Sequence, residues 1–550
     1  MKKDKLDCLE YVDSQLIEKA ETYTASKKKR SWAKWSSAIA ACLVIAVGVG
    51  SFLIPRMGSN SAPGSGAGGS GHDEGSVFMS YAGPVFPLTL QAENAAISAD
   101  RNITMDFSPW IPVWISNEEE VAAYTELTEE DRQAALNDYN TWYPDGGRYQ
   151  SSGNILVTDS YTLTNTAPQA QTVRVLYPFV SSLNHLGENL PTLHLNGAVP
   201  ETILHAGSYA GGFQGAWANG PTEENPGSLN LDYFDSWEGY RDLLSDGSYL
   251  QRALGEFVDL SDIPVTVYAF TDPWGPERDG AAGMPNPTIR VMFELDYTKT
   301  KVLSYGFNQG LNDMEKGTMG RGFSISRPND QLYGETRYLI ILGDDVANMR
   351  YEGYVTGGWD TKETAETGVT VTRSETNLEE ALRAAALCRY GIDEQFIFYE
   401  MHPEYDFELY FGLLKEHLVS YGLLAVNAVE RYDAGMLEEL DVSSVDRVLW
   451  LEAEVTIPAG DSIILSAAFE KKPSFDFHCA ATENKGISGY DLVTALGSNL
   501  RFDEQSAKLE DQGQIEIVRQ NFGFDLANGI TEVKLTEPHY YLEVKSAEKK

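Results

Sequence analysis

The feature that most constrains this chain is an uncharged, largely apolar run of 19 residues, Ser36–Ile54. A helix rises 1.5 Å per residue, so the run would span about 28 Å, close to the ~30 Å hydrocarbon core of a bilayer. Basic residues are concentrated just before the run, whereas only Arg56 follows it closely. Since Lys and Arg are enriched on the cytoplasmic side, we predict one transmembrane helix at 36–54, with residues 1–35 in the cytoplasm and the C-terminal part outside the plasma membrane.

The residues next to this run fit a membrane interface. Trp32 and Trp35 precede it, and indole rings prefer the boundary between lipid and water, where Lys28 and Arg30 would face the headgroups. A cleaved secretory signal and a lipoprotein signal at Cys42 are the alternatives. A secretory signal has a shorter apolar core near the N-terminus, and here most of the apolar run follows Cys42, which favours a retained anchor.

The N-terminal tail has a helical stripe. Leu9, Val12 and Leu16 recur at helical spacing within residues 1–25, opposite a face of acids and lysines. A short helix is marginal in water unless its apolar side is covered. The stripe therefore predicts docking to a cytoplasmic protein or the membrane surface, and a weakly ordered tail is the alternative.

A flexible linker, 55–76, is expected after the anchor. Residues 58–76 contain 12 Gly or Ser in 19 positions, a composition typical of a flexible tether. Beyond it the chain is strongly acidic, which produces most of the overall net charge of −39 from 42 basic and 81 acidic residues. Nucleic-acid binding requires cations against phosphate, so the charge argues against a nucleic-acid partner.

The rest of the chain predicts a large α+β, β-rich ectodomain of antiparallel, sandwich-like sheets with a helical segment. Alternating apolar residues bounded by turn residues indicate strands; they occur at 156–163, 172–178, 265–270, 288–295, 337–342, 368–373, 448–457, 462–469, 515–519, 532–535 and 540–544. We divide the ectodomain into a β-rich unit at 77–365 and an α+β unit at 366–550. A discontinuous sandwich, built from 155–180 and 446–545 around an insertion, is the alternative.

Helices are expected where apolar spacing and capping residues agree. Glu118–Tyr139 predicts two short helices, and 236–253 one that is broken near Gly247. Leu378–Tyr390 follows a capping residue that is either Thr376 or Asn377, and Pro403–Tyr421 opens with a proline and ends at a glycine.

Common catalytic motifs are absent: the sequence has no HExxH, GxSxG, P-loop or strand-linked GxGxxG. The densest polar cluster comprises Glu400, His402, Glu404 and Asp406. Two carboxylates across a cleft could hydrolyse a glycosidic bond. Acids at a helix start are also favoured by the helix dipole, so we expect no catalytic residue and keep this cluster as the low-ranking candidate.

No cofactor is expected, with calcium as the alternative. Asp232, Asp235 and Glu238 lie close together and carry the oxygen ligands that calcium prefers. They do not match the spacing of a calcium-binding loop. Many acids in a long chain also produce such groups without function.

Two further residue pairs have structural interpretations. Cys388 and Cys479 are the thiols beyond the anchor and could form a disulfide outside the cell; a buried free thiol at Cys388 is the alternative. Trp110 and Trp114 lie near prolines and are expected to be an exposed aromatic pair that could stack on sugars, although large aromatics more often fill a core.

The N-terminal pattern LDCLEYVDSQLIEKAE, SKKKRSWAKW and SSAIAACLVIAVGVG resembles that of single-pass, membrane-anchored extracytoplasmic proteins of anaerobic Gram-positive bacteria. Some of those proteins are anti-sigma-like, and most are uncharacterised. The resemblance covers about 50 residues. This chain lacks the His…CxxC zinc signature of the best-known anti-sigma domains.

Together these features predict an anchored interaction or sensing protein without catalytic activity, whose partner outside the cell is a glycan or a protein. A cell-surface enzyme acting on glycans or the envelope is one alternative. A passive surface or assembly protein is the other.

Overall fold

The computed structural model describes residues 81–110, 113–122, 129–150, 153–207, 236–276, 286–325, 335–390, 405–420, 437, 442–443, 446–476 and 486–547. The predicted tail 1–35, anchor 36–54 and linker 55–76 lie outside these residues. Within the described part of the chain, no helix is long and apolar enough to cross a membrane. The fold is β-rich with antiparallel sheets and few helices, which confirms the β-rich class predicted for the chain after residue 76.

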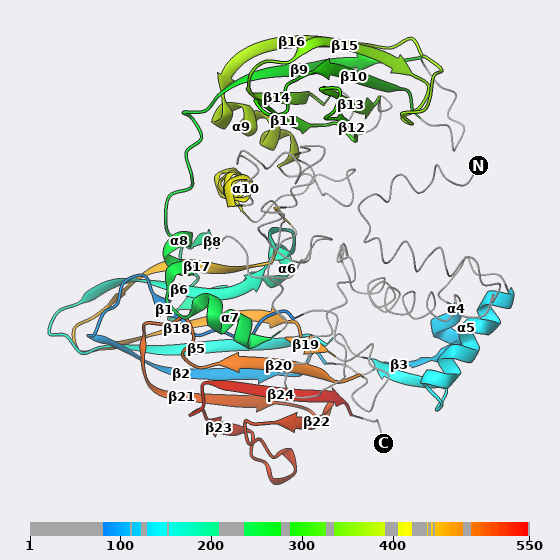
Figure 1. The fold of residues 1–550 in the computed structure, drawn as a ribbon. Coiled ribbons are helices and arrows are strands. Elements are labelled where there is room, and N and C mark those ends of the chain that lie inside the picture. Colours follow the sequence, from blue (N-terminus) through cyan, green and yellow to red (C-terminus); the bar gives the residue numbers. More distant parts are fainter. Residues whose placement is uncertain are drawn as a thin grey trace.

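Apart from a separate two-stranded sheet of residues Val113–Ser116 and Gly147–Gln150, the strands form two bodies, which Figure 1 shows one above the other. The second sandwich consists of residues 264–377 and is inserted into the first, whose strands come from residues 89–206 and 447–546. The predicted boundary at 365/366 falls inside the second sandwich, just before its last strand. Segments far apart in sequence therefore lie side by side in the first sandwich.

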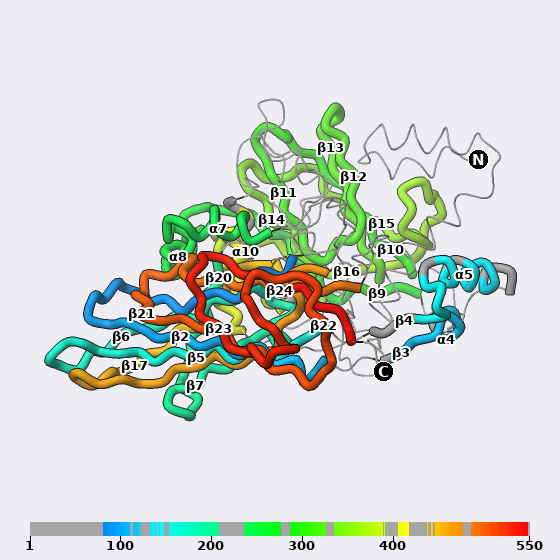
Figure 2. Tube along the Cα trace, turned by 90° about the horizontal axis from the view of Figure 1, so that it is seen from below, coloured from blue at the N-terminus to red at the C-terminus, as the bar shows by residue number. Residues whose placement is uncertain are grey.

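The first sandwich opposes one long sheet to two shorter ones (Figure 2). The long sheet has the order β23 (Glu532–Lys534), β21 (Arg501–Glu510), β2 (Ile97–Asp106), β5 (Ile155–Asn165), β18 (Ser462–Lys471) and β7 (Thr192–Leu195). The β17 sheet has the order β1 (Thr89–Leu90), β6 (Gln171–Ser181), β17 (Arg447–Ile457) and β8 (Ile203–Ala206). The β24 sheet has the order β19 (Phe475–Asp476), β20 (Ser488–Val493), β24 (His539–Ser546) and β22 (Ile515–Gln520). The β2–β21 pair is parallel, and every other pair in these sheets is antiparallel.

Both short sheets pack on the same face of the long sheet. Alternate residues of a strand share a face, and in β2 Ile97 belongs to the apolar core under the β17 sheet while Ile103 belongs to the core under the β24 sheet. The two cores therefore lie one after the other along the long sheet, with a seam between them.

An ion pair fills this seam. The guanidinium of Arg101 donates two hydrogen bonds to Asp159, at 2.9 and 2.8 Å, and both side chains are fully buried. It also donates to the backbone carbonyls of Phe86 (3.0 Å), in the segment that leads from the β24 sheet to β1, and Val493 (2.9 Å), at the end of β20. Tyr161 donates to the same carboxylate at 2.7 Å. The pair is thus satisfied by hydrogen bonds, as a buried charge requires.

The second sandwich packs two four-stranded sheets with an apolar interior. One sheet has the order β12 (Gln309–Asp313), β13 (Thr318–Ser324), β10 (Thr288–Glu294) and β15 (Ala347–Tyr354). The other has the order β11 (Thr300–Tyr305), β14 (Arg337–Gly343), β9 (Pro264–Trp274) and β16 (Gly368–Asn377). Phe270, Phe307 and Phe323 meet edge to face at its centre, with ring centroids 5.5–6.4 Å apart.

Helices connect and cover these sheets. They are α4 (Asn117–Ala122), α5 (Glu129–Trp142), α6 (Leu186–Asn189), α7 (Trp237–Leu244), α8 (Ser248–Ala253), α9 (Leu378–Arg389) and α10 (Phe407–Ser420). The paired helices at 118–139, the break near Gly247 and the cap at Asn377 are confirmed, whereas α10 begins at Phe407 rather than at 403. In Figure 1, α10 lies between the sandwiches. α9 packs on β9, β14 and β16 of the second sandwich, and one apolar cluster continues from the first sandwich through α10 and α9 to Val265, Leu303 and Ile340.

Candidate binding groove

Most residues singled out from the sequence lie outside the described part of the chain. This holds for the docking stripe, the membrane-interface residues, two metal candidates, three catalytic candidates and one cysteine: Leu9, Val12, Leu16, Trp32, Trp35, Lys28, Arg30, Asp232, Asp235, Glu400, His402, Glu404 and Cys479. The hypotheses that rest on them remain predictions.

Asp406 has a structural role in α10. Its Oδ1 accepts a hydrogen bond from the backbone N–H of Leu409 at 2.7 Å, which is how an N-terminal cap satisfies a free donor of the first helical turn. The alternative interpretation, an acid favoured at a helix start, therefore accounts for this residue.

The other described candidates are separate from one another. Glu238 is exposed in the first turn of α7. Cys388 is a free thiol in α9, where its Sγ lies 3.4 Å from the carbonyl of Ala384 and burial raises its pKa. Among the described residues, no group of three His, Cys, Asp or Glu side chains is placed to hold a metal ion.

The prediction of an exposed aromatic pair is confirmed for Trp114 and wrong for Trp110. Trp114 lies on β3 (Val113–Ser116), which pairs with β4 (Gly147–Gln150), and is 44% exposed. Trp110 is buried in the core under the β24 sheet, where its Nε1 donates to the hydroxyl of Ser546 at 3.0 Å. Trp110 can be buried in this core because the hydroxyl of Ser546 satisfies the hydrogen-bond donor of its ring.

A buried polar cluster lies on the other side of the β24 sheet. Asp491 accepts a hydrogen bond from the hydroxyl of Tyr81, and the Nε2 of His539 lies 3.0 Å from its other oxygen. The ring of Trp237 stacks on His539 with centroids 4.5 Å apart. Burial raises the pKa of Tyr81 well above its ordinary value. These groups satisfy one another in a closed site, so we assign them a structural role.

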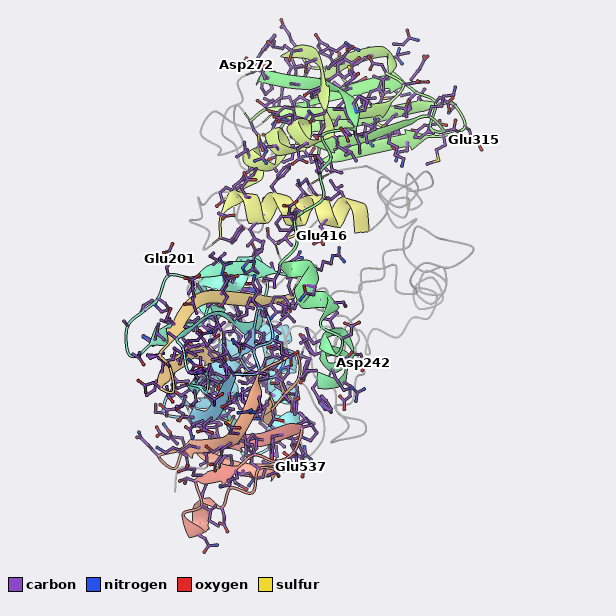
Figure 3. The ribbon with its side chains drawn as sticks, turned by 90° about the vertical axis from the view of Figure 1, so that its left-hand side faces the viewer. Glu201, Asp242, Asp272, Glu315, Glu416 and Glu537 are labelled. Carbon is purple, nitrogen blue, oxygen red and sulfur yellow. The ribbon has the colours of Figure 1, made fainter. Side chains whose placement is uncertain are left out.

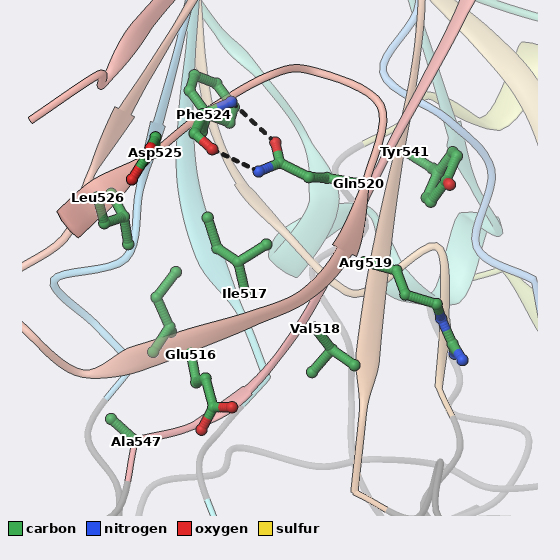
Figure 4. Close-up of a pocket in the computed structure, with 11 residues that line it drawn as sticks. Glu516, Ile517, Val518, Arg519, Gln520, Phe524, Asp525, Leu526, Tyr541 and Ala547 are labelled. Atoms are coloured by element: carbon green, nitrogen blue, oxygen red, sulfur yellow. Dashed lines mark hydrogen bonds between the residues drawn. The ribbon is translucent and has the colours of Figure 1, made fainter. Parts of the chain in front are cut away.

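An open groove follows β22 at the end of the β24 sheet (Figure 4). Its volume is about 860 Å³. The lining combines apolar and charged residues from β22, the loop after it and both ends of β24: Ile515, Glu516, Ile517, Val518, Arg519, Gln520, Phe524, Asp525, Leu526, Tyr541 and Ala547. Sites of this size are large enough to hold several side chains of a ligand.

A bulge at Val518 shapes the strand beside the groove. The pairing with β24 shifts between Ile517 and Arg519, so that Val518 is an extra residue, 37% exposed. As a result Glu516 and Arg519 share one face of the sheet. Glu516 pairs there with Lys545 at 3.2 Å, and Arg519 donates to the buried carboxylate of Glu543. Bulges commonly re-aim side chains at sheet edges.

The loop after β22 forms a preformed wall. The side chain of Gln520 accepts from the backbone N–H of Phe524 at 3.0 Å and donates to its carbonyl at 2.6 Å (Figure 4). Phe522 stacks on Phe524, with ring centroids 5.1 Å apart, and both are buried in the core. Hydrogen bonds from Asn528 lower the pKa of Asp525, which keeps a negative charge on this wall.

Part of the backbone of β22 points into the groove. The N–H of Ala547 donates to the carbonyl of Gln514 at 2.8 Å, so Gln514 directs its backbone toward β24. Backbone direction alternates along an antiparallel pair. Ile515 and Ile517 therefore turn their N–H and C=O groups to the open side, where β22 has no neighbour among the described strands.

The sequence predicted the strand at 515–519 but not the groove. Alternation in Ile515–Ile517 marks a strand, whereas its position at a sheet edge depends on which distant strands pair. The nearest signal is the polar, turn-rich stretch after Gln520, whose glycines at 523 and 529 adopt positive φ angles in the wall.

No protein-family model matches this chain, and no curated protein matches it significantly.

Proposed function

We propose that this chain is a membrane-anchored extracytoplasmic binding protein without catalytic activity, and that its β22 groove takes an extended polypeptide segment. The anchor at 36–54 and linker at 55–76 would hold the ectodomain outside the plasma membrane, with the N-terminal tail in the cytoplasm. The resemblance of the N-terminal residues to single-pass extracytoplasmic proteins supports this placement.

The observation that carries the proposal is the open edge of β22 beside a preformed groove. Extended peptides bind sheet edges by adding a strand, with backbone hydrogen bonds for affinity and side-chain pockets for specificity. Ile515 and Ile517 offer four backbone groups to such a strand. Each hydrogen bond contributes about 0.5–1.5 kcal/mol net, so we expect a weak, reversible interaction.

The groove also favours a binding role because its wall is fixed before any ligand arrives. Gln520 and the Phe522–Phe524 stack hold the loop in place, so little ordering accompanies binding. A preformed site loses less free energy on association than a mobile one.

The binding test uses the full chain in detergent with a panel of short extended peptides that differ in charge. Backbone hydrogen exchange is read at every segment. We expect slower exchange at Ile515–Gln520 with at least one peptide. If no peptide protects this segment at millimolar concentration, the groove is not a peptide-binding site.

The placement test uses intact cells that produce the chain with a tag at each end. Protease added outside should remove the C-terminal tag and leave the N-terminal tag intact. Loss of the N-terminal tag would contradict the proposed orientation.

A further inference from the structure

We infer that the β22 groove selects a short segment in which a basic residue lies between two apolar residues. This inference rests on the proposed function and names the chemistry of the ligand. It follows from which side chains of the groove lie on each face of an added strand.

Apolar groups line the inner face. Ile517 packs against the core under the β24 sheet, and Leu526 belongs to the same apolar environment. Figure 4 shows Ile517 between Leu526 and Val518, below the loop that carries Phe524. Side chains of an added strand opposite Ile515 and Ile517 would share their face. Apolar residues fit these two positions.

A carboxylate marks the outer face. Glu516 is 57% exposed and pairs with Lys545 across the strand pair through one oxygen, at 3.2 Å, in a contact that is open to solvent on both sides. The residue of an added strand opposite Glu516 would lie beside this carboxylate, and opposite charges directly across a strand pair stabilise it. Arg519, the cation of the groove, is engaged by the buried Glu543.

The net charge of the whole chain is negative, like the charge of Glu516. Asp525 adds a second carboxylate to the wall, and the whole chain has a net charge of −39. An acidic body attracts a basic segment and raises its rate of association. The labelled acids in Figure 3 are spread over both bodies, so this attraction is general and Glu516 supplies the local selection.

A second copy of the chain fits the edge less well. If two β22 strands paired about a two-fold axis with Ile515 opposite Ile517, Glu516 of one copy would face Glu516 of the other. Like charges directly opposite destabilise a strand pair, and two copies of net charge −39 repel each other.

The bulge limits the length of the segment. Regular pairing ends at Ile517 because Val518 is inserted there. An added strand can therefore use the open backbone groups of Ile515 and Ile517, and its recognised part is three residues: apolar, basic, apolar.

The test uses the full chain in detergent and three labelled, end-capped hexapeptides that alternate valine with lysine, serine or glutamate. We expect the valine–lysine peptide to bind best. N-methylation of its valine amides, which face β22 in antiparallel pairing, should abolish binding, while N-methylation of its lysine amides should not. The two methylated peptides have the same charge, so this contrast separates strand pairing from general attraction to an acidic protein.

Charge variants test the selection. Glu516→Gln should weaken the lysine peptide about two- to fivefold, and Glu516→Lys about tenfold, while improving the glutamate peptide. Glu201→Lys makes the same charge change at an exposed site beside β8 and should leave the preference unchanged.

Two outcomes separate the inference from the proposal beneath it. Equal binding of the lysine and serine peptides, unchanged in Glu516→Lys, overturns the selection for a basic residue and leaves the peptide groove standing. Binding of none of the three peptides, with no protection at Ile515–Gln520, overturns the groove itself.

Discussion

The two sandwiches differ in how their sheets enclose an apolar core. The second one opposes two sheets of similar size over a continuous apolar core of aromatic and aliphatic side chains. The first opposes one long sheet to two short ones, and the junction of the short sheets leaves backbone carbonyls at Phe86 and Val493 facing the interior. Arg101 donates to both and is itself balanced by Asp159.

This difference explains the buried ion pair at the seam of the first sandwich, whereas the second sandwich buries Arg321 as a side chain that donates to Asn312 and to a backbone carbonyl. Unpaired buried carbonyls destabilise a fold, and a guanidinium can reach several acceptors at once. The ion pair is therefore a consequence of the seam rather than a general source of stability, since buried pairs often contribute no more than well-packed apolar residues.

The largest expected effect comes from removing the cation of the seam. Arg101→Met leaves Asp159 buried without its partner, which should lower the free energy of unfolding by about 3–5 kcal/mol. Hydrogen exchange of the full chain, read at β2 and β5 and separately at β10 and β14, measures the loss in each sandwich. A loss of the same size at all four strands would show that the sandwiches open as one unit.

A cavity in the second sandwich provides the opposite test. Ile341 is fully buried in its apolar core, and Ile341→Ala should cost about 2–5 kcal/mol. The loss should be greatest at β10 and β14 in the same exchange experiment. Ile341→Val keeps most of the side chain and should cost about 0.5–1.5 kcal/mol.

Lys471 adds a pH dependence to the first sandwich. Burial lowers its pKa to about 7, partly opposed by Asp491. Between about pH 7 and 10.5 the unfolded chain therefore binds a proton that the folded chain does not, so stability rises with pH, by at most about 1.4 kcal/mol per unit. Urea midpoints at pH 7.5 and 9.5 should differ more in the native chain than in Lys471→Met. Identical differences would refute a depressed pKa.

The smallest expected effect concerns α10, which lies between the two bodies. Asp406→Ala removes its cap and should cost about 0.5–2 kcal/mol, whereas Asp406→Asn keeps an acceptor and should cost less. Exchange at Leu409–Leu414 measures the difference. Equal protection in both variants would show that packing alone fixes the start of the helix.

The sequence predicted local elements well and their partners poorly. Strands β17 and β18 are evident from apolar alternation around the turn Pro458–Asp461, which suggests a hairpin. The structure instead pairs β17 with β6 in one sheet and β18 with β5 in another. These pairings join 155–181 to 447–471 around an inserted sandwich, as in the discontinuous alternative, and not the two units divided at 365/366.

Polar strands were missed for a related reason. β2 reads ISADRNITMD, in which Asp100, Arg101 and Asn102 look like a loop. Only the seam explains an inward-facing arginine there. The groove is similarly invisible, because the edge position of β22 and the wall formed by the following loop depend on tertiary contacts.

The insertion of one sandwich into the other also has a consequence for biosynthesis. The strands of the second sandwich all lie within 264–377, so it can close soon after it leaves the ribosome. β5 and β6 must instead wait for β17 and β18, whose synthesis ends some 280 residues later; at ~5–20 residues per second that is a delay of roughly 15 to 60 s. During this interval half of the first sandwich exposes unpaired, apolar strands, which are prone to aggregation. Folding of this chain therefore calls for a holding chaperone that shields β2, β5 and β6 until the C-terminal strands arrive.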